Sequence, residues 1–130
     1  MRLLLIRHAE AAPGEPDSLR PLTAAGRAAA RALGERLRQE GRAPEAVLTS
    51  PLLRARETGA AIARAAGVEA EADERLAPGA GPEEVRAAVA GRGEVVAVVA
   101  HQPDCAEIAG ALGGATPTSF PPGHLVEIRL

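Results

Sequence analysis

Near the start of the chain, an uninterrupted apolar run from Leu3 to Ile6 stops at Arg7 and His8. A short run of this kind is typical of a strand that is buried on both faces of a sheet. Such strands occur in α/β proteins, where helices cover both faces of a mostly parallel sheet. Ligands bind there at the carboxyl ends of the strands. The run therefore predicts an α/β fold, with Arg7 and His8 at a ligand-binding position.

Strand and helix patterns alternate along the rest of the chain. Further strands are predicted at residues 46–48, 68–72 and 95–100, and a terminal hairpin at residues 118–120 and 124–130. Helices are predicted at residues 24–40, 51–66, a short segment from 82, and 103–112. We expect a three-layer α/β/α sandwich with a mostly parallel sheet and one antiparallel strand near the C-terminus.

The first two predicted helices carry clear start signals. Thr23 is the expected N-cap of the first helix, and Ser50 followed by Pro51 is expected to begin the second. The first helix also shows an apolar stripe that we expect to face the sheet. Its members are Ala28, Ala29, Ala32, Leu33 and Leu37.

The length of 130 residues fits a single domain, residues 1–130, with little chain left for a cap subdomain. The formal net charge is −2, all 15 basic residues are Arg, and Phe120 is the one aromatic residue of the Phe, Tyr and Trp class. Scattered charge without aromatics argues against a nucleic-acid partner. No signal-like or membrane-length apolar run is seen, so we expect a cytoplasmic protein without a membrane partner.

Metal binding is not indicated either. Cys105 is the only cysteine, which excludes an internal disulfide and a thiolate cluster, and we expect it to be a packed core thiol. The chain has 3 His residues and no accompanying carboxylate cluster. We therefore expect neither a metal site nor a cofactor.

Two other segments place polar groups at the ends of predicted strands. Arg54 lies one turn into the helix that follows strand 46–48, and His101 directly follows strand 95–100. Carboxyl ends of parallel strands share one sheet edge, and helical side chains slant toward the helix N-terminus. Arg7, His8, Arg54 and His101 should therefore meet in one crevice. Guanidinium groups and a helix N-terminus suit a dianionic phosphoryl group.

These segments resemble the histidine phosphatase (phosphoglycerate mutase-like) superfamily. Arg7-His8-Ala9 is similar to its Arg-His-Gly signature, and the segment from Ser50 to Thr58 is similar to its Ser-x-x-x-Arg-Ala-x-x-Thr motif. His101 stands where the family has its second His, although Ala100 replaces the preceding Gly. The leader from Arg20 to Gly26 is also similar. The resemblance covers nearly the whole chain.

The resemblance implies two-step phosphoryl transfer without a metal. Neutral His8 would be the nucleophile, and Arg7, Arg54 and a cationic His101 would hold the phosphoryl oxygens. Ser18 and Arg20 are candidates for the rim of the phosphate site. Arg56 and Glu57, in the same motif, are expected to face solvent.

The chain departs from the family at the general acid. Mutase-type members carry an acid two residues after a Leu that corresponds to Leu76, where this chain has Pro78, and acid-phosphatase-type members have Asp where it has Gln102. Glu74 is the remaining candidate proton donor. A phosphohistidine substrate needs less protonation than an alkyl ester, because its ring nitrogen leaves readily.

The missing acid and the short chain resemble the SixA-type phosphohistidine phosphatases. The function we expect is a metal-independent phosphatase that hydrolyses phosphohistidine in a protein. The alternative is a broad phosphomonoesterase for small phosphate esters. A mutase, or a non-catalytic phosphate-binding module, fits the sequence less well.

Overall fold

The computed structural model describes residues 1–130 as a five-stranded sheet with helices on both faces. The strands are β1 (Arg2–Arg7), β2 (Ala46–Thr49), β3 (Ala70–Ala72), β4 (Val95–Ala100) and β5 (Leu125–Arg129). The helices are α1 (Ala24–Gln39), α2 (Leu53–Ala66), α3 (Pro82–Val89) and α4 (Asp104–Gly113). Two short 3-10 helices, η1 (Asp17–Leu19) and η2 (Glu74–Leu76), lie in the connecting loops.

The strand order is β3-β2-β4-β1-β5. Strands β1, β2, β3 and β4 pair in parallel, and β5 pairs antiparallel with β1. In this register Arg7, the last residue of β1, lies opposite Ala100, the last residue of β4. The ends of these strands are therefore level, as the predicted fold class requires, and the expected mostly parallel sheet with one antiparallel strand is confirmed.

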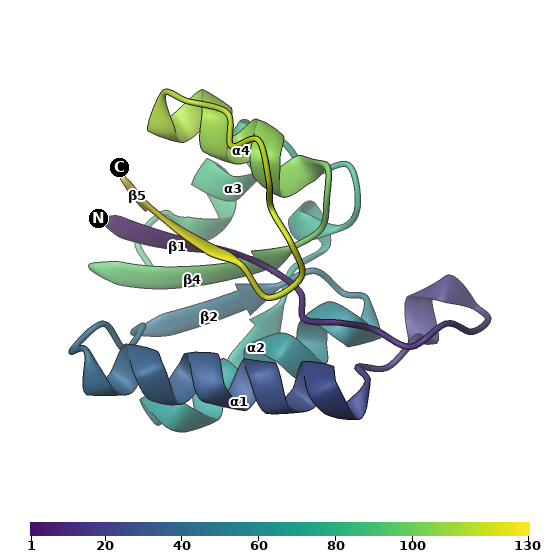
Figure 1. Ribbon diagram of the computed structural model, residues 1–130. Coiled ribbons are helices and arrows are strands. Elements are labelled where there is room, and N and C mark those ends of the chain that lie inside the picture. The colour runs from purple at the N-terminus through teal and green to yellow at the C-terminus, as the bar shows by residue number, and fades with distance from the viewer.

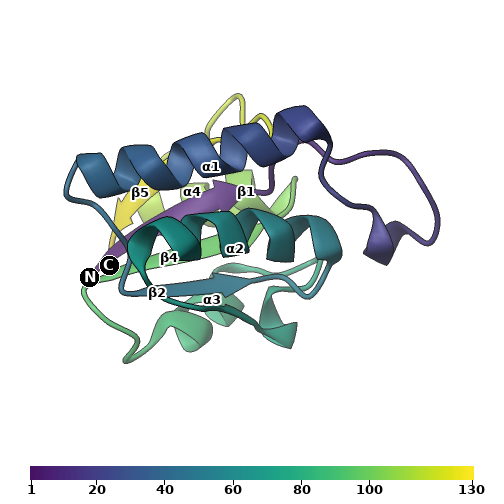
Figure 2. The ribbon, with the colours of Figure 1, turned by 90° about the horizontal axis from the view of Figure 1, so that it is seen from below.

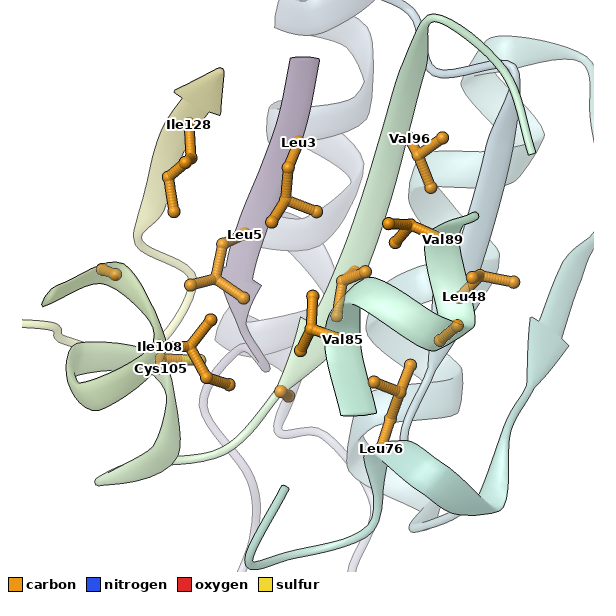
Figure 3. Packing of buried hydrophobic residues seen from close by; sticks show 14 of the residues in the cluster. Leu3, Leu5, Leu48, Leu76, Val85, Val89, Val96, Cys105, Ile108 and Ile128 are labelled. Carbon is orange, nitrogen blue, oxygen red and sulfur yellow. The ribbon is translucent and has the colours of Figure 1, made fainter. Parts of the chain in front are cut away.

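Helices α1 and α2 cover one face of the sheet, and α3 and α4 cover the other (Figure 1). The apolar residues of β1 alternate between the two cores: Leu4 and Ile6 pack with α1 and α2, while Leu3 and Leu5 pack with the opposite layer. Figure 3 shows this second cluster, in which Leu76 of η2 and Ile108 of α4 lie fully buried. The run Leu3–Ile6 is buried on both faces, as expected.

The predicted terminal hairpin is wrong. Residues 118–120 form no strand, and β5 instead pairs with β1. Pro121 and Pro122 have no backbone N–H to donate across a hairpin, and Phe120 is buried in the core rather than paired. The backbone N–H of Gly123 bonds to the carbonyl oxygens of Arg7 and His8, so this segment lies against the end of β1.

The start of α2 also differs from the prediction. The helix begins at Leu53 rather than Pro51, and the Ser50 side chain does not cap it, although Leu52 N–H donates to Ser50 Oγ at 3.2 Å. Thr23 caps α1 as predicted, because its Oγ1 accepts from Gly26 N–H at 2.9 Å.

The buried stripe of α1 is rotated relative to the predicted one. Ala28, Ala29 and Ala32 are exposed, whereas the helix buries Gly26, Ala30, Leu33, Gly34 and Leu37. The two glycines allow close approach of the backbone on this face: a Cβ at Gly34 would lie 3.1 Å from Ala61 O of α2. The buried face of α1 is therefore determined by close packing of the helix backbone against α2, and the positions of the alanines did not predict it.

No helix is both long and apolar enough to cross a membrane.

Candidate active site

His8 follows β1 directly, and backbone contacts fix its position. Its N–H donates to Ala100 O of β4, and its Nδ1 lies 2.8 Å from Ala9 O. A carbonyl oxygen only accepts, so Nδ1 carries the proton in this contact. The lone pair of the neutral ring is therefore on Nε2, the nitrogen that a nucleophile would use.

His101 follows β4 and lies beside His8, with 5.2 Å between the ring centroids. Its Nε2 lies 2.7 Å from Ser50 Oγ at the end of β2. Both His101 and Ser50 are buried. Three neighbouring strand ends thus contribute to one cluster, and Ser50 belongs to it as a partner of His101, a contact that the sequence motif did not identify.

Burial lowers the pKa of both histidines. The positive charges of Arg54 and Arg7 lower the pKa of His8 further, although its contact with Ala9 O acts the other way. The pKa of His101 falls to about 4, first through burial and then through the charges of His8 and Arg54. Both rings are consequently neutral at pH 7. Without a bound anion His101 is therefore neutral, because burial and the nearby cations oppose another positive charge. The expectation of a cationic His101 concerns the phosphoryl-bound protein and stays a prediction.

Arg54 and Arg7 both lie close enough to His8 for their charges to lower its pKa. Arg7 Nη1 donates to Phe120 O at 3.0 Å, while its buried Nε has no partner. A buried guanidinium N–H without an acceptor is costly, so an anion at this point would satisfy it.

Arg54 is largely buried in the first turn of α2 and holds η1 against the body of the protein. Its Nη1 donates to Asp17 O at 2.9 Å, and its Nη2 donates to Asp17 Oδ2 at 3.2 Å. Arg20 Nη1 donates to the other carboxylate oxygen of Asp17 at 3.0 Å. Asp17 therefore links two arginines, a role that no sequence motif indicated.

The two predicted rim residues differ in their placement. Arg20 is anchored by its Nε to Ala12 O and lies close enough to contribute to the lowered pKa of His8. Ser18 is exposed on η1 and makes no side-chain hydrogen bond. The geometry therefore favours Arg20 over Ser18 as a group near the candidate phosphate position.

The strand-end cluster is tied to the helices by Thr58 and Glu57. Thr58 Oγ1 accepts from Ala9 N–H at 3.0 Å and donates to Arg54 O at 2.8 Å. Glu57 is half-buried, and its Oε1 accepts from Leu22 N–H at 2.8 Å, so one carboxylate oxygen is bound to the protein instead of facing solvent as expected. Its neighbour Arg56 is exposed, as expected, and its Nε donates to Pro51 O.

Neither position considered for the general acid bonds to the histidines of this cluster. Glu74 is exposed on η2, beyond the end of edge strand β3, and makes no side-chain hydrogen bond. Pro78 is exposed in the next loop, which Asp104 holds to the start of α4 by accepting from Gly79 N–H at 2.7 Å. Cys105 is buried, and burial raises its thiol pKa to about 12, in keeping with a packed core residue. No group of His, Cys, Asp and Glu is arranged to hold a metal ion.

Comparison with known proteins decides the family. Residues 3–78 match the Histidine phosphatase superfamily (branch 1). The chain belongs to this superfamily. A relative in Picosynechococcus sp., an uncharacterized protein, is 37% identical over an alignment of 120 residues, with 86% of this chain and 73% of that protein covered.

Several solved structures match the fold closely. The protein histidine phosphatase SixA complexed with tungstate superposes with a TM-score of 0.88 at 28% identity, covering 100% of this chain and 88% of that one. The candidate phosphohistidine phosphatase SixA from Agrobacterium tumefaciens gives a TM-score of 0.80 at 30% identity, with 97% of this chain and 89% of that one covered. A mycobacterial glucosyl-3-phosphoglycerate phosphatase shares the fold at 19% identity, with a TM-score of 0.71 and 97% and 88% covered.

Proposed function

We propose that this histidine phosphatase superfamily member is a metal-independent phosphohistidine phosphatase that acts on a phosphorylated protein. One observation carries the proposal: His8 donates its Nδ1 proton to Ala9 O and so keeps the lone pair on Nε2. The depressed pKa keeps that lone pair free at neutral pH. The similarity to SixA structures supports the same activity.

In the first step, His8 Nε2 attacks phosphorus in line, and the bond from phosphorus to the leaving nitrogen of the substrate breaks. The leaving imidazole keeps the electron pair and takes a proton from solvent. Arg7, through its free Nε–H, and Arg54 bind the equatorial oxygens and stabilise their charge in the transition state. The negative phosphoryl group raises the pKa of His101, so that this ring donates a hydrogen bond to it.

In the second step, water attacks the phosphorus of phosphorylated His8. The bond to Nε2 breaks, inorganic phosphate leaves, and His8 returns to the neutral tautomer. The water proton goes to solvent. The nucleophile thus divides one hydrolysis into two displacements at the same phosphate position.

We propose phosphohistidine as the substrate because its imidazole leaving group needs little protonation. No carboxylate side chain hydrogen-bonds to His8 or His101, and Glu74 stands at the sheet edge beyond β3. Without a positioned acid, an alkyl ester loses ~10²–10⁴-fold in rate, whereas an imidazole leaves readily. If Glu74 does reach the leaving group, the alternative of a broad small-molecule phosphomonoesterase becomes the better assignment.

The test compares substrates without added metal and with a chelator present. Wild-type protein should release phosphate from a phosphohistidine protein and from aryl phosphates with good leaving groups, and should form an acid-labile phosphoryl label on His8. His8→Ala should do neither while keeping its fold. A label on Cys105 or Ser50 would contradict the mechanism, and no release from any substrate would favour a phosphate-binding module.

A series of phosphate esters with graded leaving-group pKa separates the two enzyme assignments. We expect a steep dependence of the rate on leaving-group pKa in wild type and in Glu74→Gln alike. A flat dependence in wild type that becomes steep in Glu74→Gln would identify Glu74 as the acid and support the phosphomonoesterase.

A further inference from the structure

Helices α1 and α2 lie side by side on one face of the sheet (Figures 1 and 2), and the surface between them is hollowed into a groove of about 300 Å³. A second hollow of about 310 Å³ continues along the same two helices and shares Arg31, Ala61 and Arg64 with the first. We call the two together the α1–α2 groove. The first hollow is lined by Leu22, Arg27, Ala30, Arg31, Glu57, Ala60, Ala61 and Arg64.

The α1–α2 groove carries more positive than negative side chains. Arg27, Arg31 and Arg64 take part in none of the ion pairs of the protein. Of the two acids, Glu57 is bound to Leu22 N–H and Glu35 is paired with Arg38. Exposed guanidinium groups above a floor of Leu22 and alanines suit carboxylates on a segment that also carries small apolar side chains.

The groove leads away from the candidate active site. Its near end is Leu22, which is held by Glu57, and Glu57 lies one turn after Arg54 on α2. Its far end is Arg64, and the helical rise places Arg64 about 15 Å along α2 from Arg54. An extended chain advances roughly 3.3–3.6 Å per residue. A segment leaving the phosphoryl site would therefore reach the far end after about four or five residues.

We propose that the α1–α2 groove binds an acidic segment next to the phosphohistidine of the protein substrate, an inference that rests on the proposed phosphohistidine phosphatase activity. A protein segment fits better than nucleic acid, because the groove residues include no aromatic side chain for base stacking. Its acidic residues begin about four positions from the phosphohistidine. The groove thus sets a preference for the sequence around the phosphorylated residue.

The experiment uses two synthetic peptides with a single phosphohistidine. One carries Glu and Ala at the fourth to seventh positions on both sides of the phosphohistidine, and the other carries Gln in place of Glu. The protein is tested as wild type, as the double variant Arg31→Glu/Arg64→Glu, and as Arg86→Glu. Arg86 is an exposed arginine of α3 on the opposite face, so it makes a matched control for added negative charge.

Wild type should hydrolyse the Glu peptide with about fivefold to tenfold higher kcat/KM than the Gln peptide, since each exposed ion pair contributes modestly. The preference should shrink as salt is raised. The double variant should lose the preference and keep its rate on the Gln peptide and on an aryl phosphate. Arg86→Glu should keep both the preference and the rates.

The outcomes distinguish the groove from the activity on which it rests. Equal rates on both peptides in wild type, or a preference that the double variant retains, would overturn the groove assignment alone. Hydrolysis of the aryl phosphate but of neither peptide would overturn the proposed function and the groove with it. Inhibition by a single-stranded oligonucleotide, without a preference between the peptides, would assign the groove to nucleic acid instead.

Discussion

Asp17 binds Arg54 and Arg20, two of the cations of the proposed phosphate site. Its carboxylate accepts from Arg54 and from Arg20, and these cations lower its pKa, so it stays ionised at neutral pH. A carboxylate bound to Arg54 competes with a phosphoryl group for the same N–H donors. The carbonyl of Asp17 holds a different nitrogen of Arg54 and would keep the guanidinium in place without the charge.

Asp17→Asn should therefore bind phosphate more tightly. We expect the inhibition constant of inorganic phosphate to fall about twofold to fivefold, the range of one exposed ion pair. Asp73→Asn is the matched control, because the carboxylate of Asp73 pairs with Arg75 and contacts no residue of the cluster. Weaker phosphate binding together with a lower kcat in Asp17→Asn would show instead that the carboxylate is needed to position Arg54.

Two arginines of α2 differ in a way that a pair of substitutions can measure. Arg54 is buried beside His8, whereas Arg56 is exposed and bonds only to Pro51 O. Arg54→Ala should lower kcat/KM by about 10²–10³-fold, the cost of removing one preorganised donor to transition-state charge. Arg56→Ala should change it by less than about threefold. Steady-state kinetics with an aryl phosphate checks this, and equal losses would contradict the assignment of Arg54.

At the scale of elements, α1 is fixed against the end of β1 by a glycine. A Cβ on Gly26 would overlap the backbone carbonyl oxygen of Glu10, which also accepts from Thr23 N–H. Backbone cannot move aside as cheaply as a flexible side chain. The N-terminus of α1 is therefore packed directly on the segment that carries His8.

Gly26→Ala should destabilise the fold by about 1–3 kcal/mol, the usual cost of overpacking, and should lower activity by displacing His8. Denaturant unfolding and kinetics with an aryl phosphate measure the two effects. Gly41→Ala is an unsuitable control, because Gly41 has positive φ. Ala25→Ser, at an exposed position of the same turn, should leave both properties unchanged.

The sequence predicted the elements that local patterns define. The buried runs at Leu3–Ile6 and Val95–Ala100 and the cap at Thr23 were all found where periodicity and capping chemistry placed them. The prediction of a terminal hairpin failed because β5 pairs with the open edge of β1, which is distant in sequence. The predicted start of α2 was wrong because Ser50 bonds to His101 across the sheet.

The candidate site also divides into features that local sequence patterns predict and features that they do not. Motif spacing and the ends of the predicted strands placed Arg7, His8, Arg54 and His101 at one edge of the sheet. The contacts of Asp17, the link from Thr58 to Ala9, and the neutral state of His101 arise from tertiary packing between loops. No local pattern encodes them.

At the scale of the whole molecule, the two buried histidines link stability to pH. The ordinary histidine pKa is 6.5, and folding lowers the pKa of His8 and brings that of His101 to about 4. Between pH 6.5 and about 4 the histidines of the unfolded chain bind protons that those of the folded chain do not. The free energy of unfolding should therefore be highest above pH 6.5 and should fall as the pH is lowered toward 4.

Paired carboxylates act in a different range. The pKa values of Glu35, Asp17 and Asp73 are all lowered from ordinary values of 4.5 or 3.8, so their stabilising effect is lost only in more acidic solution. Denaturant unfolding between pH 7.5 and about 5 thus reports mainly on the histidines. In this range His101→Asn should flatten the dependence of the free energy of unfolding on pH.

His124→Asn provides the control, because His124 is exposed and its ring meets that of Phe120 in a T-shaped contact. In His124→Asn the free energy of unfolding should depend on pH as steeply as in wild type. A wild-type free energy of unfolding that does not change between pH 7.5 and about 5 would contradict the lowered pKa values of the histidines, and with them the free lone pair of a neutral His8. Addition of inorganic phosphate should flatten the dependence of the free energy of unfolding on pH, because the bound anion raises the pKa of His101 toward its ordinary value.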